Sequence, residues 1–338
     1  MISYVVRRLV LSIVILMGVS VLTFVLTRVI PSDPAMRWVG KHASPEQVAA
    51  ARVELGLDKP IHVQYARYLS GFFRGDWGVS IRTHRPVLKD ILAYLPASLE
   101  LILAGMIPAL LLGIPLGTLA AAKAGSPIDH TTRFLVVLGV GMPVFWLGMI
   151  LQLLFFNVLH VLPLAERLDT LVKLLHPIRT ITGFYLVDSL ITGNFTAFVD
   201  ALRHIVLPAL TMAAFPLGMT VRMTRATMLG VLNEDYLRTA RAVGHRESRV
   251  LIRYALRNAI GPVLTVAALT LAYALVETFL IESIFAWPGL GYYASKGIST
   301  MDYPVIMGIT FLVAIVFVSV NLLVDLALAF IDPRISVN

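Results

Sequence analysis

The sequence of residues 9–27, LVLSIVILMGVSVLTFVLT, contains no charged side chain. A helix needs about 20 mostly apolar residues to cross the hydrocarbon layer of a bilayer, and this stretch has that length. Arg7 and Arg8 precede it. A secretory signal would follow such a basic start with a shorter apolar run and a small-residue cleavage site. We therefore interpret residues 9–27 as a first membrane helix that is retained.

Further uncharged runs predict the remaining spans. They are Leu101–Ala122, Phe134–Leu159, Ile205–Val221, Ile260–Val276 and Pro304–Val324. The stretch 171–202 has apolar patches broken by charged residues, and we interpret it as a re-entrant or surface segment. Five or seven spans are therefore also open. The pattern as a whole predicts an all-α polytopic membrane protein with about six transmembrane helices.

The composition agrees with lipid as the main solvent. Of 338 residues, 58% are hydrophobic and only 14% are charged, whereas soluble domains carry about 25% charged residues. The net charge of +8 is spread between apolar runs, which favours basic loops beside a membrane over nucleic-acid binding. The sequence has no cysteine, and none of its 8 histidines forms a close ligand pair. No metal site is therefore predicted.

Arginine and lysine in the short loops predict the orientation. With six spans, both termini and the loops 123–133 and 222–257 lie in the cytoplasm. The second of these loops contains Arg222, Arg225, Arg238, Arg241, Arg246, Arg249, Arg253 and Arg257. The outer loop 283–303 contains only Lys296. We therefore expect a multi-pass protein whose N- and C-termini are cytoplasmic.

Prolines recur inside the predicted spans, at positions 108, 115, 143, 208, 216 and 262. Each removes a backbone donor and tends to kink its helix. Neighbouring helices or a water-filled cavity must then satisfy the freed carbonyl groups. Ordinary helix bending and the shaping of a central passage are both open interpretations.

Residues 233–258, NEDYLRTARAVGHRESRVLIRYALRN, form the most unusual stretch. Asn233 can serve as the N-cap of a short helix, with Glu234 and Asp235 in its first turn. Gly244 predicts a turn, and a second helix follows from about Glu247. The first helix carries an apolar stripe of Tyr236, Leu237, Ala240 and Val243. The second carries a cationic edge of Arg246, Arg249, Arg253 and Arg257.

Two roles fit this pair of helices. The arginines can hold the loop on anionic lipid head groups while the apolar stripe dips into the bilayer. Alternatively, the stripe fills a groove on a cytoplasmic partner. The break at Gly244 favours docking, because anchoring to lipid does not require one.

The stretch ARAVG followed by a basic helix resembles the EAA loop of ABC-importer permeases, specifically of the dipeptide, oligopeptide and nickel permease family. Arg238-Thr239-Ala240 stands where the general pattern has Glu-Ala-Ala, and Gly244 matches its glycine. Tyr254 and Arg257 also depart from the general tail. These departures are usual in the peptide subfamily, where YLRTARA-x-G and ALRNA are the local form.

The resemblance covers nearly the whole chain. RRLVLSIVILMGVSVLTFVLTRVIPSDPA, LGLDKPIHVQYARYL, GDWGVSI, WPGLG and NLLVDLALAFIDPRI resemble motifs of the family in the same order. The resemblance implies a type I ABC-importer permease architecture. Residues 1–30 would contain the first helix and 31–97 an external segment. Residues 98–338 would form a core of five transmembrane helices, including the cytoplasmic coupling loop 222–258.

The resemblance also implies partners in a bacterial or archaeal cytoplasmic (inner) membrane. A second homologous permease would complete the pathway, two ATPase subunits would dock in the cytoplasm, and an external substrate-binding protein would deliver cargo. Because the sequence has no GxxxxGK[ST] phosphate loop, this chain is not expected to be an enzyme or to hold a cofactor, and ATP and Mg²⁺ belong to the ATPases. The residues expected to couple to them are Glu234, Asp235, Tyr236, Leu237, Ala240, Arg241, Val243 and Gly244.

Acids inside membrane spans are costly and mark candidate functional sites. Glu277 and Glu282, at the end of the fifth span, are candidates for the substrate pathway. The family often has acids at the positions of Glu282 and Asp325, which favours a structural role there and makes Glu277 the better candidate for contacting a substrate amine or cation. Residues 287–291, WPGLG, predict a rigid external turn with an interfacial tryptophan, which anchors the membrane edge or contacts the binding protein.

Other classes of protein fit less well. An ion-driven secondary transporter would usually show internal repeats, and none is visible. An intramembrane hydrolase would need a motif that pairs Ser20 or Ser299 with a base such as His204, and there is none. We therefore predict a permease for short peptides. Nickel complexes, glutathione and other small solutes, which relatives carry, remain open as alternative cargo.

Overall fold

The computed structural model describes the backbone of residues 2–29, 34–40 and 42–331, and the side chains of residues 6–27, 35–36, 38–40 and 42–323. Within these residues the regular elements are helices, beside one isolated bridge between Val79 and Pro86. The chain divides into two compact units. The first comprises residues 1–95 and 292–319, and the second comprises residues 96–291 and 320–338. The prediction of an all-α chain is confirmed.

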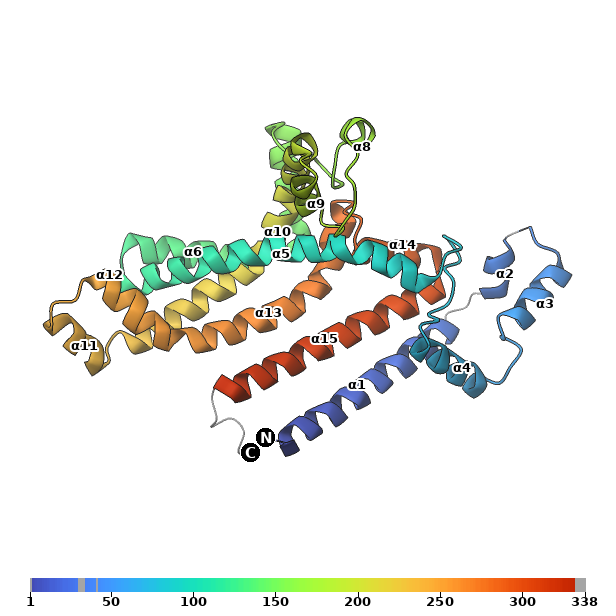
Figure 1. The fold of residues 1–338 in the computed structure, drawn as a ribbon, viewed down its shortest axis with the longest axis horizontal. Helices are drawn as coiled ribbons and strands as arrows, with labels where there is room; N and C mark the ends of the chain where they lie inside the picture. The colour runs from blue at the N-terminus through green and yellow to red at the C-terminus, as the bar shows by residue number, and fades with distance from the viewer. Residues whose placement is uncertain (1, 30–33, 41, 332–338) are drawn as a thin grey trace. The chain divides into compact units, whose positions relative to one another are not determined.

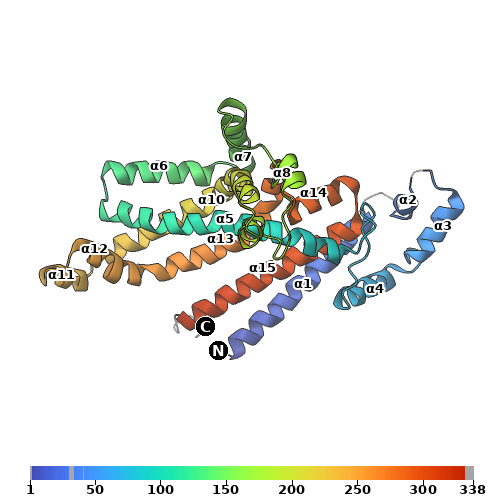
Figure 2. The same ribbon diagram turned by 45° about the horizontal axis from the view of Figure 1, so that its top comes forward.

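The first unit is built on two long apolar helices and a group of short ones. Its helices are α1 (Ile2–Val29), α2 (Pro34–Val39), α3 (Pro45–Glu54), α4 (Ile61–Phe73), the start of α5 (Val87–Ala122), most of α14 (Leu290–Thr300) and the first part of α15 (Tyr303–Ile331). In both views α1 and α15 run side by side (Figures 1 and 2). The Thr27 hydroxyl of α1 lies 3.5 Å from the Met307 sulfur of α15.

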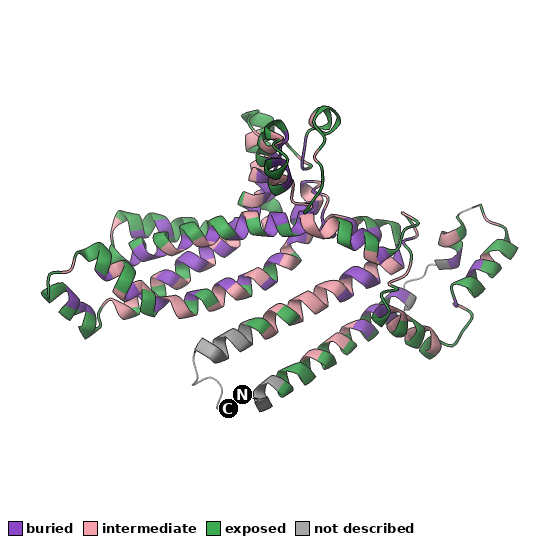
Figure 3. Cartoon of the chain, in the orientation of Figure 1, coloured by how far each residue is buried: buried purple, intermediate pink, exposed green. Residues whose placement is uncertain are grey.

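The second unit contains the rest of α5 and most of the remaining helices. They are α6 (Pro127–Gly141), α7 (Val144–Gln152), the π-helix η1 (Leu153–Val158), α8 (Thr170–Leu175), α9 (Tyr185–Ile191), α10 (Phe195–Val231), α11 (Asp235–Ala242), α12 (Glu247–Arg249), the π-helix η2 (Val250–Leu256) and α13 (Arg257–Ile284). Its core gathers buried residues of α5, α10 and α13, including Leu101, Leu207 and Ile281. Figure 3 shows these inner faces as buried and the outward faces as exposed.

Small residues let α5 approach α10 closely. A Cβ atom added at Gly113 would lie 2.8 Å from the Thr220 methyl, and one added at Gly117 would lie 2.7 Å from the Val221 carbonyl oxygen. Both distances are too short for a real contact, so the two helices pack backbone against side chain as in small-xxx-small membrane pairs. This packing forms the rigid frame on which the loop after α10 is carried.

Among the residues that the structure describes, five helices are long and apolar enough to cross a membrane. They are Val6–Thr27, Val87–Ala122, Phe195–Val231, Glu247–Ile284 and Tyr303–Leu323. A sixth span exists if the bent pair Pro127–Gly141 and Val144–Val158 crosses as one unit. The prediction of about six spans is confirmed in this sense, and the stretch 171–202 contains α8, α9 and the start of α10 but no separate helix of spanning length.

The third predicted span, Phe134–Leu159, is not one straight helix. Its two halves meet at an angle of 104° across Met142 and Pro143. Met142 is extended, with φ −83° and ψ 132°, because the ring of a following proline disfavours the helical conformation. The other five prolines lie inside continuous helices. Pro143 is therefore the proline at which the chain turns.

Two predicted spans begin too late. The fourth helical span extends back to Phe195, and the fifth begins at Glu247 and not at Ile260. Likewise, α5 begins at Val87, inside the predicted external segment 31–97. In each case the helix continues past the apolar run into charged sequence, because charged side chains do not break a helix.

Candidate functional site

The first helix of the basic loop is α11, and it begins one residue later than predicted. Its N-cap is Glu234, whose side chain makes no capping hydrogen bond, so the assignment of Asn233 as N-cap is wrong. Asp235 lies in the first turn and pairs with Arg238 at 3.2 Å. The acidic first turn agrees with the helix dipole, which favours negative charge at this end.

The predicted apolar stripe of α11 is divided between two surfaces. Leu237 is fully buried and Ala240 is 8% exposed. Both pack in a cluster with Met228 of α10 and with Val250 and Ala255 of η2. Tyr236 and Val243 are 40% and 72% exposed. Leu237 and Ala240 therefore hold α11 on its own chain, and Tyr236 and Val243 are the apolar side chains that a partner can contact.

Gly244 ends α11 in the left-handed region, with φ +88°. The Gly244 N–H donates to the Arg241 carbonyl at 2.9 Å, and the His245 N–H donates to the Ala240 carbonyl at 3.2 Å. These two bonds form a Schellman motif, in which a residue without a Cβ is preferred at this position. A Cβ atom here would meet nothing within 4 Å. The glycine is therefore required by the backbone conformation and not by crowding.

The second helix of the loop is the beginning of the fifth span. α12, η2 and α13 follow one another without a break from Glu247 to Ile284. The guanidinium of Arg241 forms two hydrogen bonds with the Glu247 carboxylate, at 3.1 and 2.9 Å, which closes the turn around Gly244. The cationic edge is exposed at all of its positions, Arg246, Arg249, Arg253 and Arg257.

Polar side chains fasten α11 to this long helix. The Asn258 amide donates to the Tyr236 hydroxyl at 2.8 Å and to the Tyr254 carbonyl at 3.2 Å. The Tyr254 ring stacks on the His245 ring, with centroids 5.5 Å apart. The predicted coupling residues therefore form one compact structure that joins the ends of α10 and α13 (Figure 1).

The Glu282 carboxylate is enclosed by its own chain. It is fully buried, accepts a hydrogen bond from the Ser98 hydroxyl at 2.5 Å, and accepts another from the Gly291 N–H at 2.6 Å. The Leu290 N–H donates to the same Ser98 oxygen at 2.7 Å. A Cβ at Gly289 would collide with this carboxylate. Glu282 therefore organises the 287–291 turn around a buried carboxyl group, and it offers no surface to a passing substrate.

Trp287 is part of the core. Its side chain is 1% exposed, and its indole N–H donates to the Ala97 carbonyl at 2.8 Å. The prediction of an interfacial tryptophan that anchors the membrane edge or meets a partner is therefore wrong. A buried tryptophan needs an acceptor for its N–H, and the Ala97 carbonyl of α5 supplies one.

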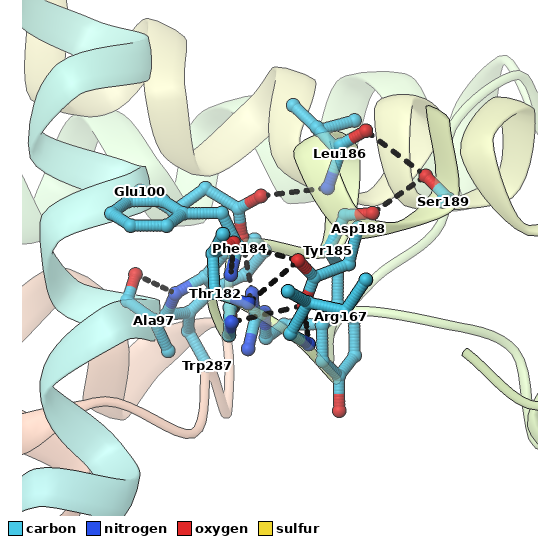
Figure 4. A network of polar contacts seen from close by, with 12 residues as sticks. Ala97, Glu100, Arg167, Thr182, Phe184, Tyr185, Leu186, Asp188, Ser189 and Trp287 are labelled. Atoms are coloured by element: carbon cyan, nitrogen blue, oxygen red, sulfur yellow. Dashed lines mark hydrogen bonds and ion pairs between the residues drawn. The ribbon is translucent and has the colours of Figure 1, made fainter. Parts of the chain in front are cut away.

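A buried ion pair that the sequence interpretation missed lies close to Trp287 (Figure 4). Arg167 and Glu100 are each 5% exposed and form a direct salt bridge. The second Glu100 oxygen accepts the Leu186 N–H at 2.9 Å, and Arg167 also donates to the Gly183 carbonyl at 2.9 Å. The guanidinium lies 3.5 Å from the Tyr185 ring centroid. This pair fixes the segment between η1 and α10 onto α5.

Asp188 stabilises the same segment from within. Burial alone would raise the pKa of its carboxyl, but hydrogen bonds from Thr182, Ile181 and Gly183 outweigh burial and lower the pKa below its ordinary value. The Thr182 hydroxyl and N–H bond to one carboxylate oxygen at 2.7 and 2.8 Å. The loop before α9 is thus wrapped around a charged carboxylate, which makes it an ordered structure.

Glu277 differs from these acids. It lies on α13 inside the fifth span and is partly exposed. Among the residues that the structure describes, none forms a hydrogen bond or ion pair with its side chain. An acid in a span without such a partner in its own chain is a candidate for contact with a substrate or another subunit. The side chain of Asp325 lies outside the described residues.

The fold and this loop define a polytopic membrane subunit whose fifth span is continuous with a structured, basic loop. A family model described as "Binding-protein-dependent transport system inner membrane component" matches residues 113–337. A second, for the N-terminal part of such membrane components, matches residues 1–102. The chain belongs to this family and is an inner-membrane permease subunit of an ABC importer.

Relatives place the chain among the dipeptide and oligopeptide permeases. It is 44% identical to a dipeptide transport system permease protein of Escherichia coli, over 99% of both chains. It is 44% identical to a probable D,D-dipeptide transport system permease protein of the same species, over 96% of this chain and 94% of the relative. It is 37% identical to an oligopeptide transport system permease protein of Bacillus subtilis, over 99% of both.

Proposed function

We propose that this chain forms, with a second homologous permease, the pathway through which an ATP-driven importer moves short peptides. The assignment of peptides as the cargo rests on a single observation. The chain is 37–44% identical, over nearly its full length, to relatives named for dipeptide and oligopeptide transport. An external substrate-binding protein delivers the peptide. ATP and Mg²⁺ bind to two cytoplasmic ATPase subunits, because this sequence has no phosphate loop. Both termini lie in the cytoplasm, as the arginine-rich loop 222–257 indicates.

Coupling in this proposal runs through the packing of α11. One of the two ATPases presents a groove that receives the exposed Tyr236 and Val243, and the buried Leu237 and Ala240 pass its motion to α10 and η2. Because η2 continues directly into α13, the motion reaches the fifth span through helical backbone. Rigid elements of this kind are the physical means by which a change at one site biases another.

The full transporter tests this function directly. The chain, co-purified with its partner subunits and reconstituted in proteoliposomes with the binding protein, should accumulate a labelled dipeptide only when ATP is supplied on the ATPase side. Uptake driven by a proton or sodium gradient in the absence of ATP would contradict the proposal. Uptake of a nickel complex, without uptake of the dipeptide, would leave the permease role standing and show that the cargo is not a peptide.

The substitution Glu277→Gln should weaken peptide transport by roughly tenfold in kcat/KM, since a charge-assisted hydrogen bond contributes about 1.5–3 kcal/mol. The proposed contact is with the peptide ammonium group. Initial uptake rates at varied dipeptide concentration measure the effect, and Glu166→Gln, which changes an exposed acid outside the predicted spans, is the matched control. Wild-type rate and affinity in Glu277→Gln would remove Glu277 from the pathway.

A further inference from the structure

The first unit contains a cavity of about 460 Å³ that no part of the coupling mechanism uses. Phe24 and Thr27 contribute to it from the end of the first span, and Tyr303 and Met307 from the beginning of the last. Residues of α2, α3, α4 and the 76–81 loop complete its wall. Its volume is within the range of about 300–1,000 Å³ typical of small-ligand sites, and it lies where two membrane helices end.

Two polar side chains of α4 that belong to the cavity wall have buried atoms without a hydrogen-bond partner among the described residues. The Gln64 amide nitrogen donates to the carbonyls of Lys59 at 2.8 Å and Leu57 at 3.3 Å, which fixes the amide orientation. Its Oε1 is buried and has no hydrogen-bond partner within the described part of the chain, and the same is true of the Tyr68 hydroxyl. Burial raises the pKa of Tyr68 to about 12, so this hydroxyl is an O–H donor at neutral pH. Buried unpaired groups of this kind need an explanation.

Charged side chains of both signs line the same cavity. Arg67 and Glu54 belong to its wall, and both are exposed. Arg67 also interacts electrostatically with Asp58. A Cβ at Gly56 would lie 2.9 Å from Arg67 Nη1, so the guanidinium rests against the Gly56 backbone. An anion and a cation can therefore be bound within one site.

Aromatic rings form much of the remaining wall. Trp38 and Trp77 line the cavity, and Phe24 stacks on Tyr68 with centroids 6.0 Å apart. Such rings attract ammonium groups through their negative faces.

We propose that this cavity binds the head group of a zwitterionic phospholipid, with the phosphate at Arg67 and Tyr68 and the primary ammonium at Glu54 and Gln64. Phosphate accepts from arginine and from hydroxyl groups, whereas an ammonium has only donors. A free short peptide has a similar pair of charges. The position of the cavity at the ends of two spans favours the lipid, whose acyl chains stay in the bilayer.

Titration of the full chain, purified in detergent, tests this proposal. Glycerophosphoethanolamine should change the tryptophan fluorescence, since Trp38 and Trp77 line the cavity. Tyr68→Phe and Arg67→Gln should each weaken this binding by roughly tenfold, as expected for loss of a hydrogen bond to a charged group. Mass spectrometry of the purified chain should find phosphatidylethanolamine retained in the wild type and depleted in both variants.

The controls separate the possible ligands. Arg74→Gln changes an arginine at the end of the same helix that is not part of the cavity wall, and it should bind as the wild type does. Tyr68→Phe removes a hydroxyl for which the described residues provide no partner, so it should fold normally. Tighter binding of dialanine than of the lipid head group would overturn the proposal in favour of a peptide site. Binding of neither compound, or equal binding by Tyr68→Phe and the wild type, would overturn it altogether.

Discussion

The substitution Gly244→Val is expected to abolish ATP-driven uptake while the protein still inserts into the membrane. The φ of +88° at this position is unfavourable for a residue with a Cβ, by about 1–2 kcal/mol and more for a β-branched side chain. Since nothing lies within 4 Å of the added Cβ, the strain acts on the backbone alone. The Schellman turn would open, and α11 would lose its position relative to Glu247.

A matched substitution separates this mechanism from general damage. Asn adopts the left-handed conformation far more readily than valine, so Gly244→Asn should retain most of the uptake. Both variants should be present in membrane fractions at the wild-type level, as measured by immunoblotting. Uptake near the wild-type rate in the reconstituted Gly244→Val complex would show that α11 does not couple the ATPases to this chain.

The substitution Arg167→Met should destabilise the second unit strongly. It leaves Glu100 as a buried carboxylate without its cationic partner, and the loss of one member of a buried pair typically costs about 3–5 kcal/mol. We expect the melting temperature of the purified chain to fall by roughly 5–10 °C. Thermal unfolding in detergent, followed by tryptophan fluorescence, measures this shift.

Removing the second charge provides the control. In the double variant Glu100→Gln/Arg167→Met no ionised group is left unpaired, so a substantial part of the lost stability should return. Lys173→Met removes a cation from an exposed pair with Glu166 and should change stability by less than about 1 kcal/mol. A single variant Arg167→Met as stable as Lys173→Met would show that the buried pair does not hold the segment in place.

Hydropathy predicted the number of spans well but their shapes less well. Hydropathy shows whether a run of residues is apolar, but it does not show whether the helix axis changes direction within that run. The turn at Met142 and Pro143 therefore falls inside one predicted span. An apolar run also stops at charged residues. Hydropathy therefore predicts that the fifth span begins at Ile260. The helix in fact continues back through Arg249, Arg253 and Arg257, which lie on its exposed side.

The missed interactions depend on residues far apart in the sequence. Glu100 directly precedes an uncharged run, and an acid at that place signals a partner, but nothing local identifies Arg167 as that partner. Trp287 was assigned from the usual behaviour of tryptophan in external turns. Its burial depends on an acceptor at Ala97, which only the folded chain brings near. The turn at Gly244, by contrast, is determined by neighbouring residues and was predicted correctly.

The π-helical segment η2 joins the coupling loop to the rest of the fifth span. In a π-helix each N–H bonds five residues back and not four, so this segment holds more chain per turn than an α-helix of the same length. Deletion of a single residue within 250–256 would restore α-helical spacing. Because an α-helix turns further per residue than a π-helix, the helix on either side of the deletion would keep nearly the same facing, and Leu237 and Ala240 would still pack against it. The wide turn thus accommodates one additional residue, and a homologue could gain or lose one codon here while its loop still faces the ATPase in the same direction.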